Sequence, residues 1–112
     1  MKKKIFVLPG DGIGPEIVSQ AVKVIKAVDS AFDHKFELTN GLIGASSIRE
    51  NSEPITEDAI GIGKEADAVL VGAIGEGEFD NDPNIKVRPE QGLLKLRKAL
   101  SLYSNIRPVS MY

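Results

Sequence analysis

The chain has 112 residues, of which 42% are hydrophobic and 27% charged, as is typical of one compact globular domain. Its formal net charge of -2 gives no electrostatic reason to expect nucleic acid or an anionic membrane as a partner. The absence of cysteine excludes disulfides, thiolate nucleophiles and Cys-ligated zinc. The longest apolar run, Ala68 to Ile74, is far shorter than the about 20 residues of a membrane-spanning helix. We therefore expect a cytoplasmic protein.

The beginning of the chain predicts a strand, a tight turn and a long helix. Ile5 to Leu8 is an unbroken apolar run, as expected of a strand buried on both faces, and it is too short for the apolar core of a secretory signal. After the turn at Pro9–Gly12, Pro15 suits the first turn of a helix, where its missing N–H costs nothing. Apolar residues then recur at helical spacing over about five turns: Ile17, Val18, Ala21, Val22, Ile25, Val28 and Phe32.

The middle of the chain repeats this alternation. Lys35 to Thr39 predicts a second strand, because apolar and polar residues alternate there. Asn40 to Arg49 is rich in Gly and Ser and predicts a loop, with room for one helical turn. Thr56 is a suitable cap for a helix that ends near Glu65.

The last part of the chain predicts one more strand and one more helix. Ala68 to Ile74 predicts a third strand, again buried on both faces. Gly75 to Val87 is a long polar loop, of the kind that is usually functional or mobile. Pro89 opens a helix that ends near Leu100, and Ile106 to Tyr112 predicts a last strand or a connector.

The alternation of strands and helices predicts an α/β fold with a largely parallel sheet and helices on both of its faces. In such sheets, ligands bind at the carboxyl ends of the strands. Three segments form that edge: Pro9–Gly14, Gly75–Val87 and the residues just before the helix at Pro89. We therefore expect a functional site among these segments.

Gly10 to Glu16 is a glycine-rich turn between a strand and a helix. It is similar to a dinucleotide-binding fingerprint but departs from it, because the third glycine would fall where the chain has Pro15. The backbone of such a turn can approach a ligand closely, and the helix N–H groups can face an anion. The residues alone leave two interpretations open, a ligand-binding turn and the commoner case of a turn chosen for its geometry.

The helix after Pro89 has two different sides. One stripe combines an acid, two leucines and an arginine: Glu90, Leu93, Leu94 and Arg97. Leu96, Ala99 and Leu100 lie on another side and can face the core. The first stripe can hold a ligand that carries an apolar branch beside an anion. The commoner alternative is that the acid favours the helix start, the leucines are core and the arginine is solvated.

A second arginine follows at a short distance along the chain. Arg107 precedes a proline and is therefore biased towards extended backbone. From the end of a helix and the start of an extended segment, Arg97 and Arg107 could converge on one carboxylated substrate, since the guanidinium fork binds carboxylate bidentately. Two unrelated surface arginines are the alternative.

Metal-binding residues are scarce. One histidine, His34, and no cysteine argue against a zinc site. Asp80 and Asp82 have the oxygen ligands that a hard cation prefers, but their Asn- and Pro-rich setting fits an ordinary loop better. We predict no metal ligand in this chain.

Three segments together resemble the β-decarboxylating dehydrogenases of 2-hydroxy acids, a family that includes isocitrate, isopropylmalate, homoisocitrate and tartrate dehydrogenases. The segments are Leu8–Glu16, Ala66–Gly75, and Arg88–Lys98 followed by Asn105–Val109. The last is similar to the isopropylmalate branch, because isocitrate enzymes carry a hydrophilic residue, typically serine, where this helix has its leucine pair. The resemblance covers essentially the whole chain in the family's order.

The resemblance implies an NAD-dependent oxidative decarboxylase of 3-isopropylmalate, a step of leucine biosynthesis, that works as a homodimer with Mg or Mn. In the family, the metal polarises the substrate, a lysine takes the hydroxyl proton and a tyrosine helps to protonate the enol. These residues and the metal ligands come later in the family's chain, so we expect no catalytic residue up to Tyr112 and no turnover by this chain alone. Residues 1–102 would be the amino-terminal half of the first, cofactor-side domain, and residues 103–112 the start of the connection into the second. The alternatives are a non-catalytic nucleotide-binding or interaction module of the same family and a related tartrate- or homoisocitrate-type dehydrogenase.

The resemblance also implies roles for single residues on the substrate side. Arg97 and Arg107 match the arginines that bind the substrate carboxylates. Leu93 and Leu94 match the apolar wall that receives the isopropyl branch.

On the cofactor side, Ile13 matches a residue near the adenosine half, and Glu90 matches the acid between substrate and nicotinamide. The loop along the cofactor contributes six positions: Gly75, Glu76, Gly77, Glu78, Phe79 and Asp80. The isopropylmalate branch usually has Gly-Gly-Pro-Lys-Trp-Asp in this loop. The aromatic residue and the aspartate keep their places, but Glu78 stands where that branch has lysine.

Overall fold

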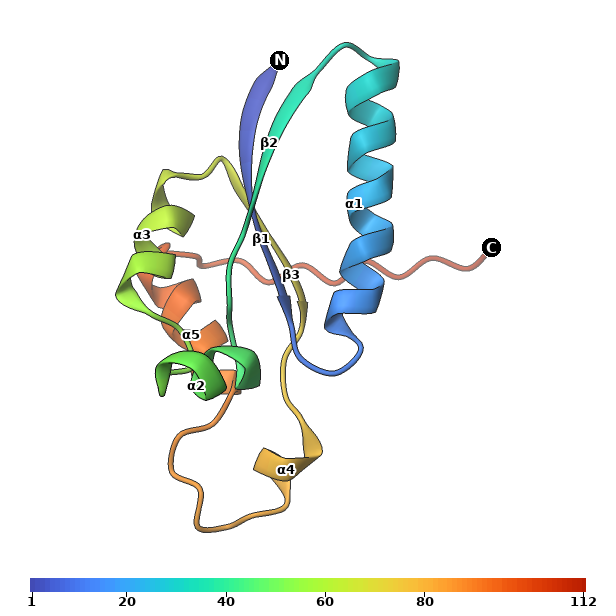
Figure 1. The fold of residues 1–112 in the computed structure, drawn as a ribbon. Coiled ribbons are helices and arrows are strands. Elements are labelled where there is room, and N and C mark those ends of the chain that lie inside the picture. The colour runs from blue at the N-terminus through green and yellow to red at the C-terminus, as the bar shows by residue number, and fades with distance from the viewer.

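The structure, a computed structural model, describes all residues from Met1 to Tyr112. Three strands and five helices follow one another along the chain (Figure 1): β1 (Lys2–Gly10), α1 (Gly14–Ala31), β2 (Lys35–Asn40), α2 (Ala45–Asn51), α3 (Glu57–Glu65), β3 (Ala68–Ala73), α4 (Gly77–Asp80) and α5 (Glu90–Ala99). None of the helices combines the length and the apolarity needed to cross a membrane.

The sheet is parallel throughout and has the order β2-β1-β3. Phe6 of β1 pairs with Thr39 on one side and with Val69 on the other, so β1 is the central strand. Its apolar run is accordingly buried on both faces, as predicted, with Phe6, Val7 and Leu8 at most 1% exposed.

Helices cover both faces of this sheet, which confirms the predicted α/β fold. Helix α1 lies on one face, and α2, α3 and α5 lie on the other (Figure 1). Successive side chains of a strand point to opposite faces, so β1 sends alternate residues into the core between the sheet and the second group of helices. That core consists of Phe6, Leu8, Ile43, Ile55, Ala59, Ile60 and Leu96.

Helix α1 covers its face only in part. Val18 is buried, but Ile17 is 46% exposed and Phe32, beyond the helix end, is 69% exposed, so the predicted apolar stripe is turned partly to solvent. A groove of about 750 Å³ remains between α1 and the strands β1 and β2. Apolar side chains from both sides line it, among them Ile25 and Leu38.

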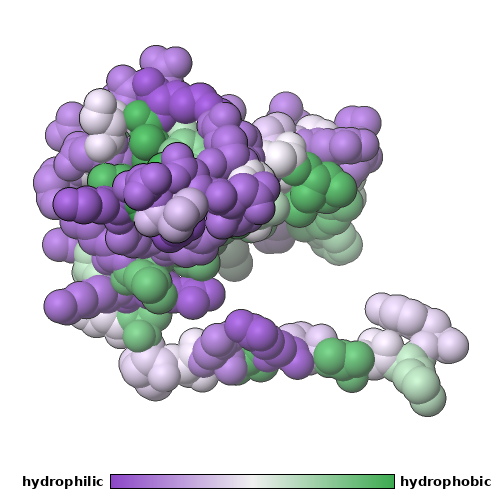
Figure 2. Space-filling model, turned by 90° about the horizontal axis from the view of Figure 1, so that it is seen from below, coloured by the Kyte–Doolittle hydropathy of each residue, from purple (hydrophilic) through white to green (hydrophobic).

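Two predicted segments differ from the structure because they lack a neighbour. β3 is an edge strand of this sheet, so its residues are exposed or half-buried and the expected burial on both faces is wrong. Residues 106–112 pair with nothing and form no strand, which leaves the connector as the observed alternative. Figure 2 shows this end of the chain standing off from the folded body as an extended strip of apolar and polar side chains.

A third difference is the helix α2, which begins inside the segment Asn40–Arg49 that was predicted to be mainly loop and extends to Asn51. It begins after Gly44, at φ 78°, and two of its first N–H groups are accepted by the carboxylate of Asp11. Asp11 lies 34 residues upstream of Ala45. The cap of this helix therefore comes from a distant part of the chain and leaves no local sequence signal.

Candidate functional site

The loops that follow β1 and β3 meet at the carboxyl end of the sheet. The Asp11 amide donates a 2.7 Å hydrogen bond to the Ala73 carbonyl oxygen, which ties the two strand ends together. A side chain at Gly10 would lie only 2.0 Å from the same oxygen, so the close approach requires glycine there. At Gly12 the Gly75 oxygen lies 3.8 Å from where a Cβ would be. Bare backbone from two loops therefore lines this edge.

Asp11 organises the site from within. Its side chain is only 2% exposed, and its carboxylate accepts hydrogen bonds from the amides of Ala45 at 2.7 Å, Ser46 at 2.8 Å and Gly75 at 3.0 Å. One buried anion thus joins the β1 turn, the start of α2 and the loop after β3. In the sequence, Asp11 is recognisable only as part of a turn, because its partners are 34 to 64 residues away.

Arg49, near the end of α2, binds two acids of the predicted cofactor loop. Its guanidinium group forms ion pairs with Glu76 and, at 2.6 Å, with Glu78. The guanidinium carbon also lies 6.0 Å from the centre of the Phe79 ring. The hydrogen bond to Glu76 raises the pKa of Arg49 most, and the bond to Glu78 raises it further. The hydrogen bond from Arg49 in turn lowers the pKa of Glu76. No motif in the sequence indicated this role for Arg49, because its acidic partners are 27 and 29 residues away.

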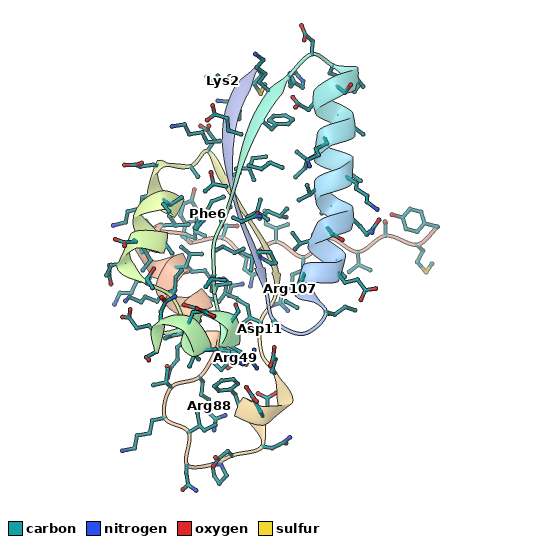
Figure 3. All side chains as sticks on the ribbon, in the orientation of Figure 1. Lys2, Phe6, Asp11, Arg49, Arg88 and Arg107 are labelled. Atoms are coloured by element: carbon teal, nitrogen blue, oxygen red, sulfur yellow. The ribbon has the colours of Figure 1, made fainter.

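The loop from Gly75 to Arg88 is held by a second arginine. Arg88 donates a 2.6 Å hydrogen bond to the Phe79 carbonyl oxygen and a 3.4 Å bond to that of Asp82. Phe79 is 9% exposed, and the short helix α4 forms around it. Asp11 in the turn after β1, Arg49 in α2 and Arg88 in the loop before α5 lie towards the same end of the sheet (Figure 3). No local motif marked Arg88 for this role.

Most predicted cofactor-side residues lie at this edge. Glu90 opens α5, and its carboxylate oxygen is 2.9 Å from where a Gly75 side chain would begin. Ile13, directly before α1, is 59% exposed. The amide of Gly12 donates a 3.4 Å hydrogen bond to Glu76. Asp80 is exposed and ends α4.

Helix α5 has the two sides that its spacing predicts. Leu96 is 2% exposed and belongs to the core, with Ala99 and Leu100 packed against it. Leu94 is 62% exposed, and Glu90 and Arg97 are also exposed. Leu93 is half-buried. The alternative in which the leucine pair is entirely core does not hold for Leu94.

The two predicted substrate arginines are not brought into one hollow. Arg97 lines a hollow of about 400 Å³ together with residues 102–106. Arg107 lies beyond it, on the exposed end of the chain, and is not among the lining residues. Residues 102–112 are all exposed, so packing does not direct Arg107 towards α5.

The acidic and histidine side chains do not form a metal centre. No group of three or more His, Cys, Asp or Glu side chains is arranged to hold a metal ion. Asp82 accepts a hydrogen bond from the Asn84 amide, and His34 stacks on Phe32 with ring centres 6.3 Å apart.

The chain is similar in sequence and structure to known dehydrogenases. The chain is 51% identical over 112 residues to 3-isopropylmalate dehydrogenase of Priestia megaterium and 47% identical to that of Bacillus subtilis, in each case over 100% of this chain and 30% of the relative. The chain thus spans about a third of the length of these relatives. Among solved structures, a β-decarboxylating dehydrogenase from Thermococcus kodakarensis matches with a TM-score of 0.67 and 36% identity, over 90% of this chain and 27% of that one. Isocitrate dehydrogenase from Methylococcus capsulatus matches with a TM-score of 0.61 and 28% identity, over 90% of this chain and 26% of that one.

The sequence model of one family, isocitrate/isopropylmalate dehydrogenase, matches residues 4–112. That match spans the central strand, the loops at its carboxyl end and the two-sided helix α5, so the chain belongs to the isocitrate/isopropylmalate dehydrogenase family.

Proposed function

We propose that this chain is the amino-terminal part of an NAD-dependent 3-isopropylmalate dehydrogenase, which oxidises and decarboxylates its substrate in leucine biosynthesis. The observation that carries the proposal is the outer stripe of α5, where an apolar side chain stands in solvent between charged ones. Leu94 is 62% exposed although the same helix buries Leu96. An exposed apolar side chain at the edge where ligands bind suits a substrate with a hydrocarbon branch.

In this proposal, Leu93 and Leu94 form the wall for the isopropyl branch, and Arg97 binds a carboxylate of the substrate. Arg107 is the second carboxylate ligand and reaches the site once the segment after Leu102 is packed. Guanidinium groups suit this role because each can bind a carboxylate with two parallel hydrogen bonds.

The residues at the sheet edge fit one part of a dinucleotide better than another. Glu76, Glu78 and Glu90 are acids, and only Arg49 makes ion pairs with any of them. Carboxylates accept hydrogen bonds from ribose hydroxyls and favour the positively charged nicotinamide ring, but they repel a pyrophosphate. We therefore assign the loop Gly75–Asp80 and Glu90 to the nicotinamide and sugar side of NAD. Ile13 is assigned to the adenosine half, and the ligands of Mg or Mn to residues beyond this chain.

The proposal includes the larger organisation of the enzyme. Residues 1–102 contribute half of the cofactor-side domain, residues 103–112 begin the connection to the second domain, and the complete protein is a cytoplasmic homodimer. The edge of β3 and the groove beside α1 are then covered by parts of the complete enzyme. The alternatives are a tartrate- or homoisocitrate-type dehydrogenase and a non-catalytic module of the same family.

Steady-state assays of the complete protein separate these possibilities. With Mg²⁺ and NAD, we expect 3-isopropylmalate to be oxidised with a kcat/KM at least about 10-fold above that of malate, tartrate or homoisocitrate, because an apolar wall distinguishes substrates by about 1–3 kcal/mol. A preference for tartrate or homoisocitrate would select the related enzyme. No turnover with any of the four would select the non-catalytic module.

A further inference from the structure

Glu78, the residue that departs from the isopropylmalate pattern, has a partner in the structure. Arg49 lies 2.6 Å from its carboxylate, and the two residues are 29 positions apart in the sequence. No lysine or arginine other than Arg49 makes an ion pair with Glu76 or Glu78. The negative charge that replaces a lysine in this loop is therefore balanced by a cation on α2.

We infer that Arg49 is a positioning residue that holds the loop Gly75–Asp80 for the cofactor, and that Arg49 and Glu78 form a matched charge pair. The positioning role of Arg49 rests on the proposed binding of NAD by that loop. The matched pair of Arg49 and Glu78 does not depend on NAD.

The geometry shows why one side chain can set the position of the loop. Arg49 is fixed at its base, because α2 is capped by the buried carboxylate of Asp11 through Ala45, one helical turn earlier. Its guanidinium group then contacts acids on both sides of Gly77 and lies over the Phe79 ring. Arg88 cannot replace it, since that side chain binds backbone carbonyl oxygens instead of the acids.

The charges explain why the two residues must match. Without Arg49, the carboxylates of Glu76 and Glu78 would repel each other with no cation between them, and no ion pair would hold the loop to α2. A lysine at position 78 would face a guanidinium group at the distance of the present ion pair, which turns attraction into repulsion. A lysine there is compatible with this loop geometry only when residue 49 carries no positive charge.

The test is a charge-exchange cycle in the complete protein: Glu78→Lys, Arg49→Asp and the double variant, with Arg49→Lys as the conservative replacement. Glu37→Lys is the matched control, because it reverses one charge of an exposed ion pair with Lys2 on the opposite end of the sheet. Two readouts are measured for each variant: hydrogen exchange of the amides of residues 75–80, and KM for NAD against kcat. Thermal melts verify that all variants are folded.

Glu78→Lys should speed exchange in the loop and raise KM for NAD by about two- to fivefold, the range expected for exposed ion pairs. The double variant should return both readouts to within about twofold of the starting protein. Arg49→Lys, which keeps a cation at this position, should change both readouts less than Arg49→Asp does. A double variant no better than Glu78→Lys in either readout would overturn the matched pair. Faster exchange in Arg49→Asp with an unchanged KM for NAD would overturn the positioning role. Absence of turnover in the unsubstituted protein would instead contradict the proposed function, and the exchange data would still decide whether the pair is matched.

Discussion

Replacing Asp11 by Asn should destabilise the fold far more than a change of one charge on the surface. The carboxylate is 2% exposed and accepts three backbone hydrogen bonds, of which the one from Ala45 is itself buried. Asn keeps one acceptor oxygen and brings an NH₂ group towards donors that need an acceptor. A hydrogen bond to a charged group contributes about 1.5–3 kcal/mol. Losing an N-cap costs about 0.5–2 kcal/mol.

These terms overlap, because the bond to Ala45 is also the helix cap, and water can reach the part-buried amides of Ser46 and Gly75. We therefore expect a loss of about 3 kcal/mol in the free energy of unfolding, a large share of the about 5–15 kcal/mol typical of a domain. Urea unfolding followed by far-ultraviolet circular dichroism measures this value.

Asp67→Asn is the matched control for this experiment. The Asp67 carboxylate also accepts a backbone hydrogen bond, from the Lys4 amide at 2.8 Å, but at an exposed position. We expect a loss below about 1 kcal/mol there. If the two substitutions differ by less than about 0.5 kcal/mol, the reasoning that Asp11 organises this edge is refuted.

Four further predictions follow from the site and from the exposed surfaces. In the complete enzyme, Leu94→Ser should lower kcat/KM for isopropylmalate by about 10- to 200-fold with little effect on kcat/KM for malate. Arg97→Lys should instead lower kcat/KM for both substrates, because lysine lacks the bidentate fork. Equal losses for Leu94→Ser with both substrates would show that the leucine has a structural role. The 112-residue chain alone should reduce no NAD with isopropylmalate and Mg²⁺ above a buffer blank, because the family resemblance assigns no base and no metal ligand to these residues. The same chain should form dimers or larger species in sedimentation experiments, since β3 has an open edge and Phe32 is 69% exposed; a monomer at high concentration would contradict this. The ion pair between Glu76 and Arg49 should be complete above the ordinary Glu pKa of 4.5 and be lost as the pH falls through the lowered pKa of Glu76. Protection of the amides of residues 75–80 from hydrogen exchange, corrected for the intrinsic rate, should therefore decrease in that pH range. The same decrease should be absent in Arg49→Met, which has no ion pair to lose.

Elements whose signals are local could be predicted from the sequence. Thr56 was expected to cap a helix, and its hydroxyl oxygen accepts a 3.1 Å hydrogen bond from the Ala59 amide at the start of α3. The apolar run in β1 predicted a strand buried on both faces, and Phe6, Val7 and Leu8 are buried in the central strand. In each case the partner that stabilises the element is within a few residues or is the whole core, so the pattern carries the information.

Burial on the outer surfaces could not be predicted in the same way, because it depends on neighbours. The apolar residues of β3 resemble those of β1, yet β3 is half-exposed since nothing pairs with its other edge. Residues 106–112 have strand-like composition but no partner, and a strand without a ladder has no stabilising hydrogen bonds.

The candidate site shows the same limit at the level of single side chains. The spacing of α5 was sufficient to separate Leu94 from Leu96, because both sides belong to one helix. Asp11, Arg49 and Arg88 were missed because each acts on groups that a motif does not contain: distant amides, acids of another loop and backbone carbonyl oxygens. The same reasoning accounts for Glu78. Within its own motif the acid is only a departure from a pattern, but beside Arg49 it is half of an ion pair. A substitution in such a loop can therefore be interpreted only together with the residue that faces it in the fold.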